Sequence, residues 1–394
     1  MNGDHSTQIP TPDVPEPGKE TRFVNGMRLN GRQWLCVALA VSIVMLGMPW
    51  LWKKWEPVEI RPDYRIPYRL SKDYWFYERE LARAGSSSIA LVGDSVIWGE
   101  YVRADGTLSY FFNVQCGQPE KFVNIGVNGM FPLALEGLMR DYAKPLHGRK
   151  VILHCNMLWL TSPKADLNTD KEERFNHSDL VPQFSPRIPC YKADLNRRLA
   201  ATVERHFTFA QWANHLQAAY FDQKSILTWT LEEDLNNSSH LAHAYENPFA
   251  RITLSVPGEP LVDPDRGPSS ARHKPWSTTG VGTTRFEWVD LDQSLQWAAF
   301  QRLVDILRSR GNNVLVLVGP FNEHMMAEEN RVLFRKLRDG IVKALATKHV
   351  SYIVPDVLPW SLYADASHPL TEGYQLLAER IYDDKDFKKW LGKP

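Results

Sequence analysis

The feature that most limits how this chain can fold is an uncharged apolar run near its N-terminus, residues 33–52 (QWLCVALAVSIVMLGMPWLW). A helix of about 20 such residues is long enough to cross the roughly 30 Å hydrocarbon core of a bilayer. Trp34 lies at one end of the run, and Trp50 and Trp52 lie at the other, as interfacial aromatic residues do. The run therefore predicts one transmembrane helix.

A buried core helix and a cleaved signal peptide are the other two interpretations of this run. Core helices seldom extend this far without a charge. Residues 38–40 (ALA) resemble a signal-peptidase site, but apolar residues continue well beyond them, so cleavage would leave an apolar new terminus. Basic residues flank the run almost equally on both sides, so the positive-inside rule hardly distinguishes the two membrane orientations. Because a polar, proline-bearing tail precedes one span and a large domain, we expect a single-pass membrane protein whose main domain is extracytoplasmic.

Composition excludes several classes of protein. The 46 basic and 46 acidic residues balance, which argues against nucleic acid as a partner because phosphate binding needs a basic surface. The four cysteines include no CxxC pair, which excludes a disulfide scaffold and a cysteine-rich zinc site. With 43% hydrophobic residues the chain can build a sizeable globular core.

Short apolar runs alternate with amphipathic helical patterns in the rest of the chain. The runs lie at 88–92, 121–125, 150–153, 313–318 and 351–354, and the helical patterns at 131–144, 291–310, 325–347 and 371–383. Strands that alternate with helices form parallel sheets covered on both faces. The pattern predicts an α/β fold, a three-layer, doubly wound parallel sheet of five strands.

We expect five segments along the chain. They are a disordered tail (1–32), a transmembrane anchor (33–52), a linker with a lead-in helix that Ser71 can cap (53–86), the α/β domain (87–160 and 291–394) and a large insert (161–290). A structureless loop as long as the insert is implausible inside a compact domain. The insert is therefore predicted to be an inserted subdomain or a lid.

Polar residues follow each apolar run, at the sheet edge where doubly wound folds bind their ligands. They are Gly93-Asp94-Ser95, Asn124 to Gly129, His154-Cys155-Asn156, Gly319 to Asn322, and Asp365 to Pro369. A hydroxyl, a base, a carboxylate to orient the base, and donors for an oxyanion are the parts of a nucleophilic serine site.

Two of these motifs together resemble the SGNH (GDSL) hydrolase superfamily. Gly93-Asp94-Ser95 is similar to its nucleophile block, and Asp365-x-x-His368-Pro369 with Gly373-Tyr374 is similar to its C-terminal block. The resemblance covers about 88–160 and 291–385, hence the predicted sheet but neither the anchor nor the insert. Either motif alone also fits a solvated turn serine or a helix-capping segment, whereas both in this order favour the family. The resemblance implies a flavodoxin-like SGNH fold and a site that uses no cofactor.

Three residues take the candidate catalytic roles. A serine hydroxyl is a poor nucleophile without an adjacent base, so Ser95 requires one. His368 is the candidate base, and Asp365, three residues before it, can hold the tautomer that leaves the other ring nitrogen free for Ser95.

The choice of oxyanion donors depends more on the family resemblance than the choice of Ser95, His368 and Asp365 does. It implies the backbone N–H groups of Ser95 and Gly129, with Gly126 as second choice for the glycine, and an amide from Asn156, with Asn322 as second choice. The family's third block reads Gly-x-Asn-Asp, whereas the third apolar run here is followed by His-Cys-Asn-Met at residues 154–157. Cys155 invites a thiol or metal interpretation, but no His/Cys spacing of ligand type surrounds it, so we predict no metal.

The resemblance implies a serine acyl-ester hydrolase whose substrate is a small acyl ester of a carbohydrate or envelope polymer. The first alternative is an O-acyltransferase that moves an acyl group to a polysaccharide hydroxyl beside a multi-span acyl donor protein. The second is an inactive carbohydrate-binding envelope protein, which the full Ser/His/Asp set disfavours. Hydrolysis and transfer use the same three residues, so the sequence does not separate them.

Overall fold

The computed structural model describes residues 29–57, 65–85, 87–231, 247–256 and 273–392. Most of the tail predicted as disordered (1–28) lies outside these described residues, as do parts of the predicted linker (58–64 and 86) and insert (232–246 and 257–272). The chain divides into two compact units, residues 1–48 and residues 49–394.

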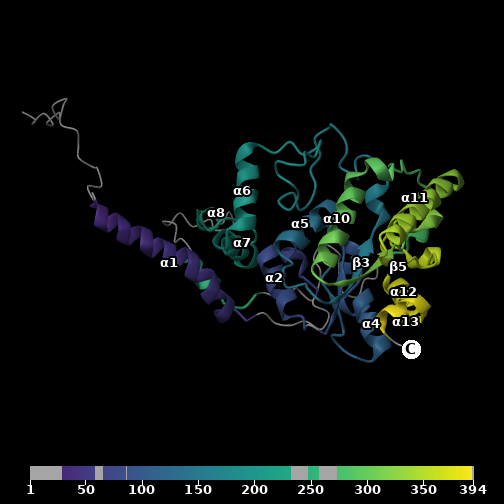
Figure 1. The fold of residues 1–394 in the computed structure, drawn as a ribbon, viewed down its shortest axis with the longest axis horizontal. Helices are drawn as coiled ribbons and strands as arrows, with labels where there is room; N and C mark the ends of the chain where they lie inside the picture. The colour runs from purple at the N-terminus through teal and green to yellow at the C-terminus, as the bar shows by residue number, and fades with distance from the viewer. Residues whose placement is uncertain (1–28, 58–64, 86, 232–246, 257–272, 393–394) are drawn as a thin grey trace, which may run out of the picture. The chain divides into compact units, whose positions relative to one another are not determined.

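The described part of the first unit lies almost entirely in helix α1 (Gly31–Trp55) (Figure 1). At 1.5 Å per residue its 25 residues measure about 37 Å, more than the thickness of a bilayer core. Large apolar side chains such as Leu35, Leu39, Ile43 and Leu46 are exposed on it. Of the helices in the described ranges, α1 alone is long and apolar enough to cross a membrane, as the apolar run predicts.

The second unit is built on five parallel strands. They are β1 (Ile89–Val92), β2 (Phe122–Asn124), β3 (Lys150–Cys155), β4 (Asn313–Val318) and β5 (Ser351–Ile353). Their order across the sheet is β2-β1-β3-β4-β5, and every adjacent pair is parallel. The predicted α/β class and the five parallel strands are confirmed.

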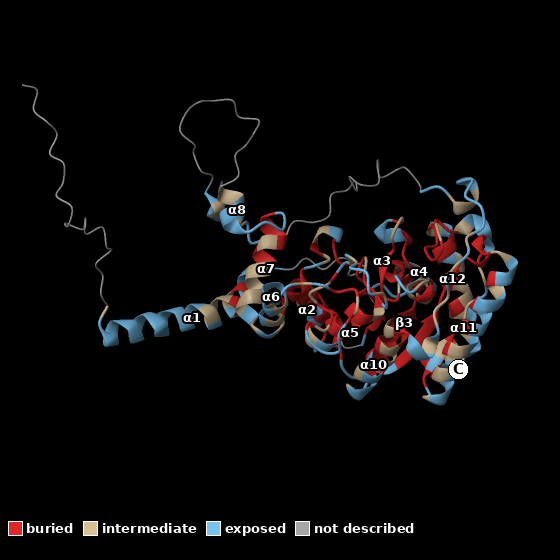
Figure 2. Ribbon diagram, turned by 90° about the horizontal axis from the view of Figure 1, so that it is seen from above, coloured by how far each residue is buried: buried red, intermediate tan, exposed pale blue. Residues whose placement is uncertain are grey.

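Both faces of the sheet are buried, and Figure 2 shows β3 inside the buried interior. Alternate residues of a strand point to opposite faces, so Leu91 belongs to one apolar cluster and Val92 to the other. One cluster includes α4 (Leu108–Cys116), α12 (Thr371–Asp383) and α13 (Lys385–Leu391), and the other includes α5 (Pro132–Asp141), α10 (Leu295–Ser309) and α11 (Glu328–Thr347). Cover on both faces explains why the strands read as continuous apolar runs.

Helices α5, α10, α11 and α12 fall within the four ranges that periodicity predicts. The lead-in helix α2 (Tyr74–Arg83) differs from the prediction at its cap. Asp73 caps it by accepting a hydrogen bond from the Phe76 N–H at 2.9 Å. Ser71 lies in helical backbone (φ −59°, ψ −22°) after a short 3-10 turn, whereas an N-cap needs a non-helical conformation.

The predicted insert, residues 161–290, contains four α-helices in its described part. They are α6 (Leu195–His206), α7 (Thr208–Tyr220), α8 (Ile226–Leu231) and α9 (Pro248–Arg251). Its ends are joined by backbone hydrogen bonds, from Glu287 N–H to Thr161 O at 2.9 Å and from Val289 N–H to Leu160 O at 3.0 Å. Helix α7 packs against α2. These segments belong to the same compact unit as the sheet.

Candidate active site

Ser95 lies at the carboxyl end of β1, where the chain turns into the short helix α3 (Ser95–Trp98). Only glycine fits two positions earlier, because a Cβ on Gly93 would lie 2.5 Å from Ile97 Cγ1 and 2.8 Å from His154 Cβ. As the first residue of α3, Ser95 has a backbone N–H without an acceptor inside the helix. The tight turn thus places the Ser95 hydroxyl and N–H together at the sheet edge.

His368 and Asp365 lie in the loop between β5 and α12, and His368 reaches Ser95 across the sheet edge. The Nε2 atom of His368 lies 2.8 Å from Ser95 Oγ, and its Nδ1 atom lies 2.9 and 2.8 Å from the two carboxylate oxygens of Asp365. With Asp365 accepting the Nδ1 proton, Nε2 is the nitrogen that can accept the serine proton. The structure therefore brings together, in series, the three residues that carry the predicted catalytic roles.

The charges around this series favour a basic imidazole. Burial would lower the pKa of His368, but the hydrogen bond and charge of Asp365 and the charges of Asp94 and Glu100 outweigh it and raise that pKa. Burial would likewise raise the pKa of Asp365, whereas its hydrogen bonds and the charge of His368 lower it. Asp365 is therefore held as the carboxylate that orients the ring and stabilises its protonated form.

Two residues that sequence reasoning did not single out contact His368. The Oε2 atom of Glu100 lies 3.7 Å from His368 Nε2. The ring of Tyr101 packs edge-on against the imidazole, with centroids 5.4 Å apart, and stacks on the ring of His273 at 4.2 Å. Tyr101 has a φ of +66°, a left-handed conformation that is uncommon for bulky residues. The only indication in the sequence that Glu100 and Tyr101 belong to the site was their position shortly after Ser95.

Asp94 has four hydrogen-bond donors around its carboxylate. They are the Val96 N–H (3.0 Å), His154 Nδ1 (3.0 Å), Asn156 Nδ2 (2.7 Å) and Trp159 Nε1 (3.0 Å). Burial would raise the pKa of Asp94, but the charge and hydrogen bond of His154 and the bond from Asn156 lower it to about 2. Sequence reasoning treated Asp94 only as part of a motif, whereas the structure makes it the anion that joins the first and third strand ends.

The two candidate amides are held differently. Asn156 Nδ2 donates to Asp94, and its Oδ1 accepts from the Leu158 N–H at 2.9 Å. An amide nitrogen carries two hydrogens, so one hydrogen of Asn156 remains beyond the bond to Asp94. Asn322 Nδ2 donates to the carbonyl of Asp365 at 3.2 Å, and its N–H donates to Ala366 O at 2.8 Å. Asn322 therefore holds the loop that carries the carboxylate.

The two candidate glycines also differ. The Gly126 N–H donates to Asn124 Oδ1 at 3.1 Å, and a Cβ on Gly126 would lie 2.6 Å from the backbone nitrogen of Trp98. Gly129 has a φ of +70°, and in the described part of the chain no acceptor faces its N–H. The loop between them is tied to the Ser95 turn by the Val127 N–H, which donates to Gly93 O at 3.1 Å. Gly129 is thus the better placed of the two to offer an N–H.

Cys155 is buried, and burial raises the pKa of its thiol, so it is held as a neutral thiol. Among the residues that the structure describes, no group of three or more His, Cys, Asp or Glu side chains could hold a metal ion.

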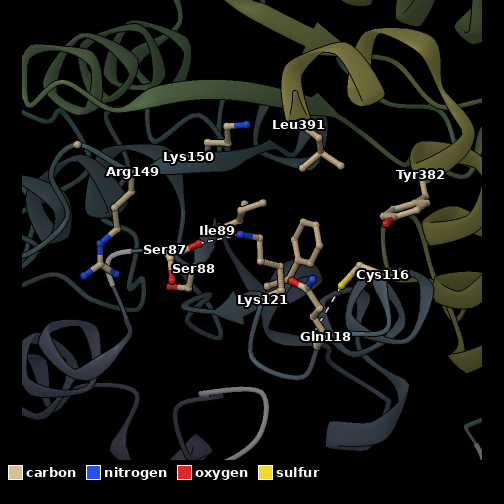
Figure 3. A pocket seen from close by; sticks show the side chains of 12 residues that line it. Ser87, Ser88, Ile89, Cys116, Gln118, Lys121, Arg149, Lys150, Tyr382 and Leu391 are labelled. Carbon is tan, nitrogen blue, oxygen red and sulfur yellow. Dashed lines mark hydrogen bonds between the residues drawn. The ribbon is translucent and has the colours of Figure 1, made fainter. Parts of the chain in front are cut away.

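Two pockets lie at opposite ends of the strands. One, of about 500 Å³, is lined by Gly129, Phe131, Trp159 and residues of the 162–176 segment. The other, of about 300 Å³, lies at the strand starts and is lined by Lys121, Arg149 and Lys150 among others (Figure 3). There the lysine ammonium groups donate to carbonyls, Lys121 to Ser87 O at 3.0 Å and Lys150 to Trp390 O at 2.9 Å. Of these two pockets, the first is lined by a predicted site residue, Gly129, and the second is not.

Comparison with known families and with characterised proteins returned no match for this chain.

Proposed function

We propose that this protein is a serine acyl-ester hydrolase of SGNH type. The observation that carries the proposal is the hydrogen-bonded series of Ser95, His368 and Asp365 at the carboxyl edge of the sheet. The strand order β2-β1-β3-β4-β5 supports it, because it is the flavodoxin-like doubly wound order, in which ligands bind at that edge. A complete series also argues against an inactive binding protein.

In the proposed reaction, Ser95 Oγ attacks the ester carbonyl carbon while His368 Nε2 takes the hydroxyl proton. The carbonyl–alkoxy bond then breaks, and the departing alkoxide oxygen receives that proton from His368. Water attacks the acyl-serine next and gives a proton to His368, which returns it to Ser95 Oγ as the carboxylic acid leaves. The N–H groups of Ser95 and Gly129 and the amide of Asn156 are the proposed donors to the oxyanion in both halves.

The proposed location is extracytoplasmic, with α1 as a single-pass membrane anchor. Its exposed apolar side chains and its length support membrane insertion. The proposed substrate is a small acyl ester on a carbohydrate or envelope polymer, the substrate class of an enzyme that faces the cell envelope.

One labelling experiment tests both the chemistry and the location. Spheroplasts that produce the full chain are treated with a membrane-impermeant fluorophosphonate, and turnover of p-nitrophenyl acetate is measured on the protein purified in detergent. We expect labelling and turnover in the wild type and loss of both in Ser95→Ala, because no other hydroxyl faces His368 Nε2 in the described part of the chain.

Ser87→Ala is the matched control, because Ser87 is an exposed serine at the opposite end of β1. It should retain labelling and turnover. Undiminished turnover in Ser95→Ala would exclude the proposed chemistry. Labelling that requires a permeant phosphonate would place the domain in the cytoplasm.

A further inference from the structure

The larger pocket is formed by two segments that both follow carboxyl ends of strands. Gly129 and Phe131 follow β2, and the remaining lining residues, from Trp159 to Asn176, follow β3. The second segment opens the predicted insert. The pocket is therefore shared between the α/β domain and the insert, at the edge of the sheet that carries Ser95.

Two contacts link this pocket to the residues around the proposed nucleophile. Trp159, on its wall, donates through Nε1 to Asp94 at 3.0 Å, and Asp94 immediately precedes Ser95. The Asn176 amide lies so close to Gly129 that a Cβ on Gly129 would come within 2.6 Å of Asn176 Nδ2. The insert segment thus lies directly against the glycine proposed to hold the oxyanion.

His177 anchors this segment. Its Nε2 lies 2.8 Å from Asn128 O, and its Nδ1 lies 3.0 Å from the Tyr74 hydroxyl. Burial outweighs the hydrogen bond to Asn128 and lowers the pKa of His177 to about 4. The ring is therefore neutral near pH 7, with Tyr74 donating to Nδ1 and Nε2–H donating to Asn128.

The pocket lining is amphipathic. Phe131 packs against Trp159 and Phe175, with ring centroids 5.8 and 5.6 Å apart, and these rings form an apolar wall. The lining also contains polar groups, including the ion pair of Lys164 and Glu173 at 3.1 Å and the exposed Arg174. A sugar ring is matched to such a lining, because it presents apolar C–H faces to aromatic rings and hydroxyls to charged and amide groups. A long acyl chain would need apolar walls throughout.

The pocket volume also indicates which half of an ester, the acyl group or the alcohol, the pocket can hold. About 500 Å³ lies in the range of pockets that bind whole small molecules. A short acyl group occupies only a small part of such a space. The alcohol half of the ester is the part that fits.

We infer that this pocket binds the carbohydrate half of an acylated sugar and that the insert segment 159–176 confers this specificity. The inference rests on the proposed function and adds to it the pocket and the side chains that recognise the sugar. Phe175 is the residue that stacks on the sugar ring, and Arg174 hydrogen-bonds its hydroxyls.

The test compares three esters on the full chain in detergent, namely an O-acetylated xylo-oligosaccharide, p-nitrophenyl acetate and p-nitrophenyl decanoate. In Phe175→Ala and Arg174→Ala we expect KM for the acetylated saccharide to rise about tenfold, the equivalent of about 1.4 kcal/mol. The kcat/KM for p-nitrophenyl acetate should fall much less than that for the acetylated saccharide, because this ester carries no sugar for these side chains to bind. Phe184→Ala is the matched control, an exposed phenylalanine of the same insert outside this pocket's lining.

The outcomes separate the inference from the proposed function. Unchanged KM for the acetylated saccharide, or a larger effect on the decanoate ester, would overturn the sugar-binding pocket while leaving the hydrolase intact. Failure of the hydrolase would show as p-nitrophenyl acetate turnover that survives Ser95→Ala. In that event, titration of Ser95→Ala with xylotetraose, followed by tryptophan fluorescence, decides the inference. Saturable binding that Phe175→Ala weakens supports it, and absence of binding overturns it.

Discussion

Asp94 organises the candidate site although it lies outside the Ser–His–Asp series. Its buried carboxylate is compensated by charge-assisted hydrogen bonds, which are about twice as strong as neutral ones. Two of its donors, His154 and Asn156, come from the end of β3, so Asp94 fixes that strand end relative to Ser95. The same bond orients the Asn156 amide, which makes Asp94 a positioning residue for the proposed oxyanion donor.

This arrangement predicts unequal effects for the two candidate amides. Asn156→Ala should lower kcat about 100- to 1,000-fold with little change in KM, as loss of one oxyanion donor does. Asn322→Ala should have a smaller effect, because Asn322 donates to the Asp365 carbonyl and acts through loop geometry. Steady-state kinetics with p-nitrophenyl acetate measures both.

Thermal melting must accompany these kinetics, because Asn156 also holds Asp94 and its loss could destabilise the turn. A large kcat loss confined to Asn322→Ala, in a well-folded variant, would move the donor from the third strand to the fourth.

At the scale of single residues, the sequence predicts where the site residues lie better than it predicts which groups they hydrogen-bond. Ser95, Asp365 and His368 could be predicted to meet because each follows an apolar run, and parallel strands bring their carboxyl ends together. The partners of Asn156 and Gly126 could not be predicted, because competition among neighbouring acceptors depends on distances that exist only in the folded chain. In the folded chain the Asn156 amide donates one hydrogen to Asp94, and the Gly126 N–H donates to the side chain of Asn124.

A buried ionic cluster joins three elements of the second unit. His215 on α7 lies between the carboxylates of Asp73, at 2.6 Å, and Glu56, at 3.0 Å, while Arg79 and Tyr220 also hydrogen-bond Glu56. Asp73 caps α2, and Glu56 directly follows α1. The cluster therefore ties α7 of the insert to the lead-in helix and to the end of α1.

This cluster predicts a pH-dependent contribution to stability. Burial would lower the pKa of His215, but Asp73 and Glu56 raise it from 6.5 to about 9. Because the folded state holds the proton more tightly, His215 stabilises fully below pH 6.5, and its contribution declines as pH rises through about 9. His215→Gln should therefore lower Tm strongly at pH 6.5, by the equivalent of about 3–5 kcal/mol for a broken buried ion pair, and much less at pH 9.5.

Differential scanning fluorimetry across this range measures the effect. The exposed His147 supplies the control, and His147→Gln should leave Tm unchanged at each pH. A deficit in His215→Gln that stays constant from pH 6.5 to 9.5 would contradict the assigned role.

Helices and strands with clear apolar periodicity were predictable, since each buries a face against the sheet. The cap of α2 was not, because Ser71 and Asp73 both suit an N-cap by residue type and only the backbone conformation distinguishes them. The cluster around His215 has no sequence signature, since its members lie up to 164 positions apart.

At the scale of the whole chain, the boundary between the two compact units falls inside α1, after residue 48. Trp52, which belongs to the second unit, is buried, and its ring packs edge-on against Trp212 at 5.6 Å and Tyr220 at 6.5 Å. The last turns of α1 are thus part of the core of the second unit. The sequence predicts an anchor from 33 to 52 but does not show that its end has this second role.

Two truncations test this boundary. Removal of residues 1–48 should release a soluble domain that melts close to the wild-type temperature. Removal of residues 1–56 should lower Tm, because it deletes both Trp52, whose loss from a core typically costs about 3–5 kcal/mol, and the Glu56 carboxylate of the ionic cluster.

Trp52→Ala in the chain that lacks residues 1–48 separates the two contributions, and we expect an intermediate Tm. Equal melting temperatures for the two truncated proteins would show that residues 49–56 add nothing to the domain.

The separation of Ser95 from His368 along the chain, 273 positions, has a consequence in time. At a synthesis rate of about 5–20 residues per second, the serine is made roughly 14 to 55 seconds before the histidine proposed as its base. Throughout that interval the nascent chain lacks the His368 imidazole, the group that lies against the Ser95 hydroxyl in the folded chain. In the proposed mechanism, Ser95 therefore gains nucleophilic strength late in the biogenesis of this protein, once the loop that follows β5 has been made.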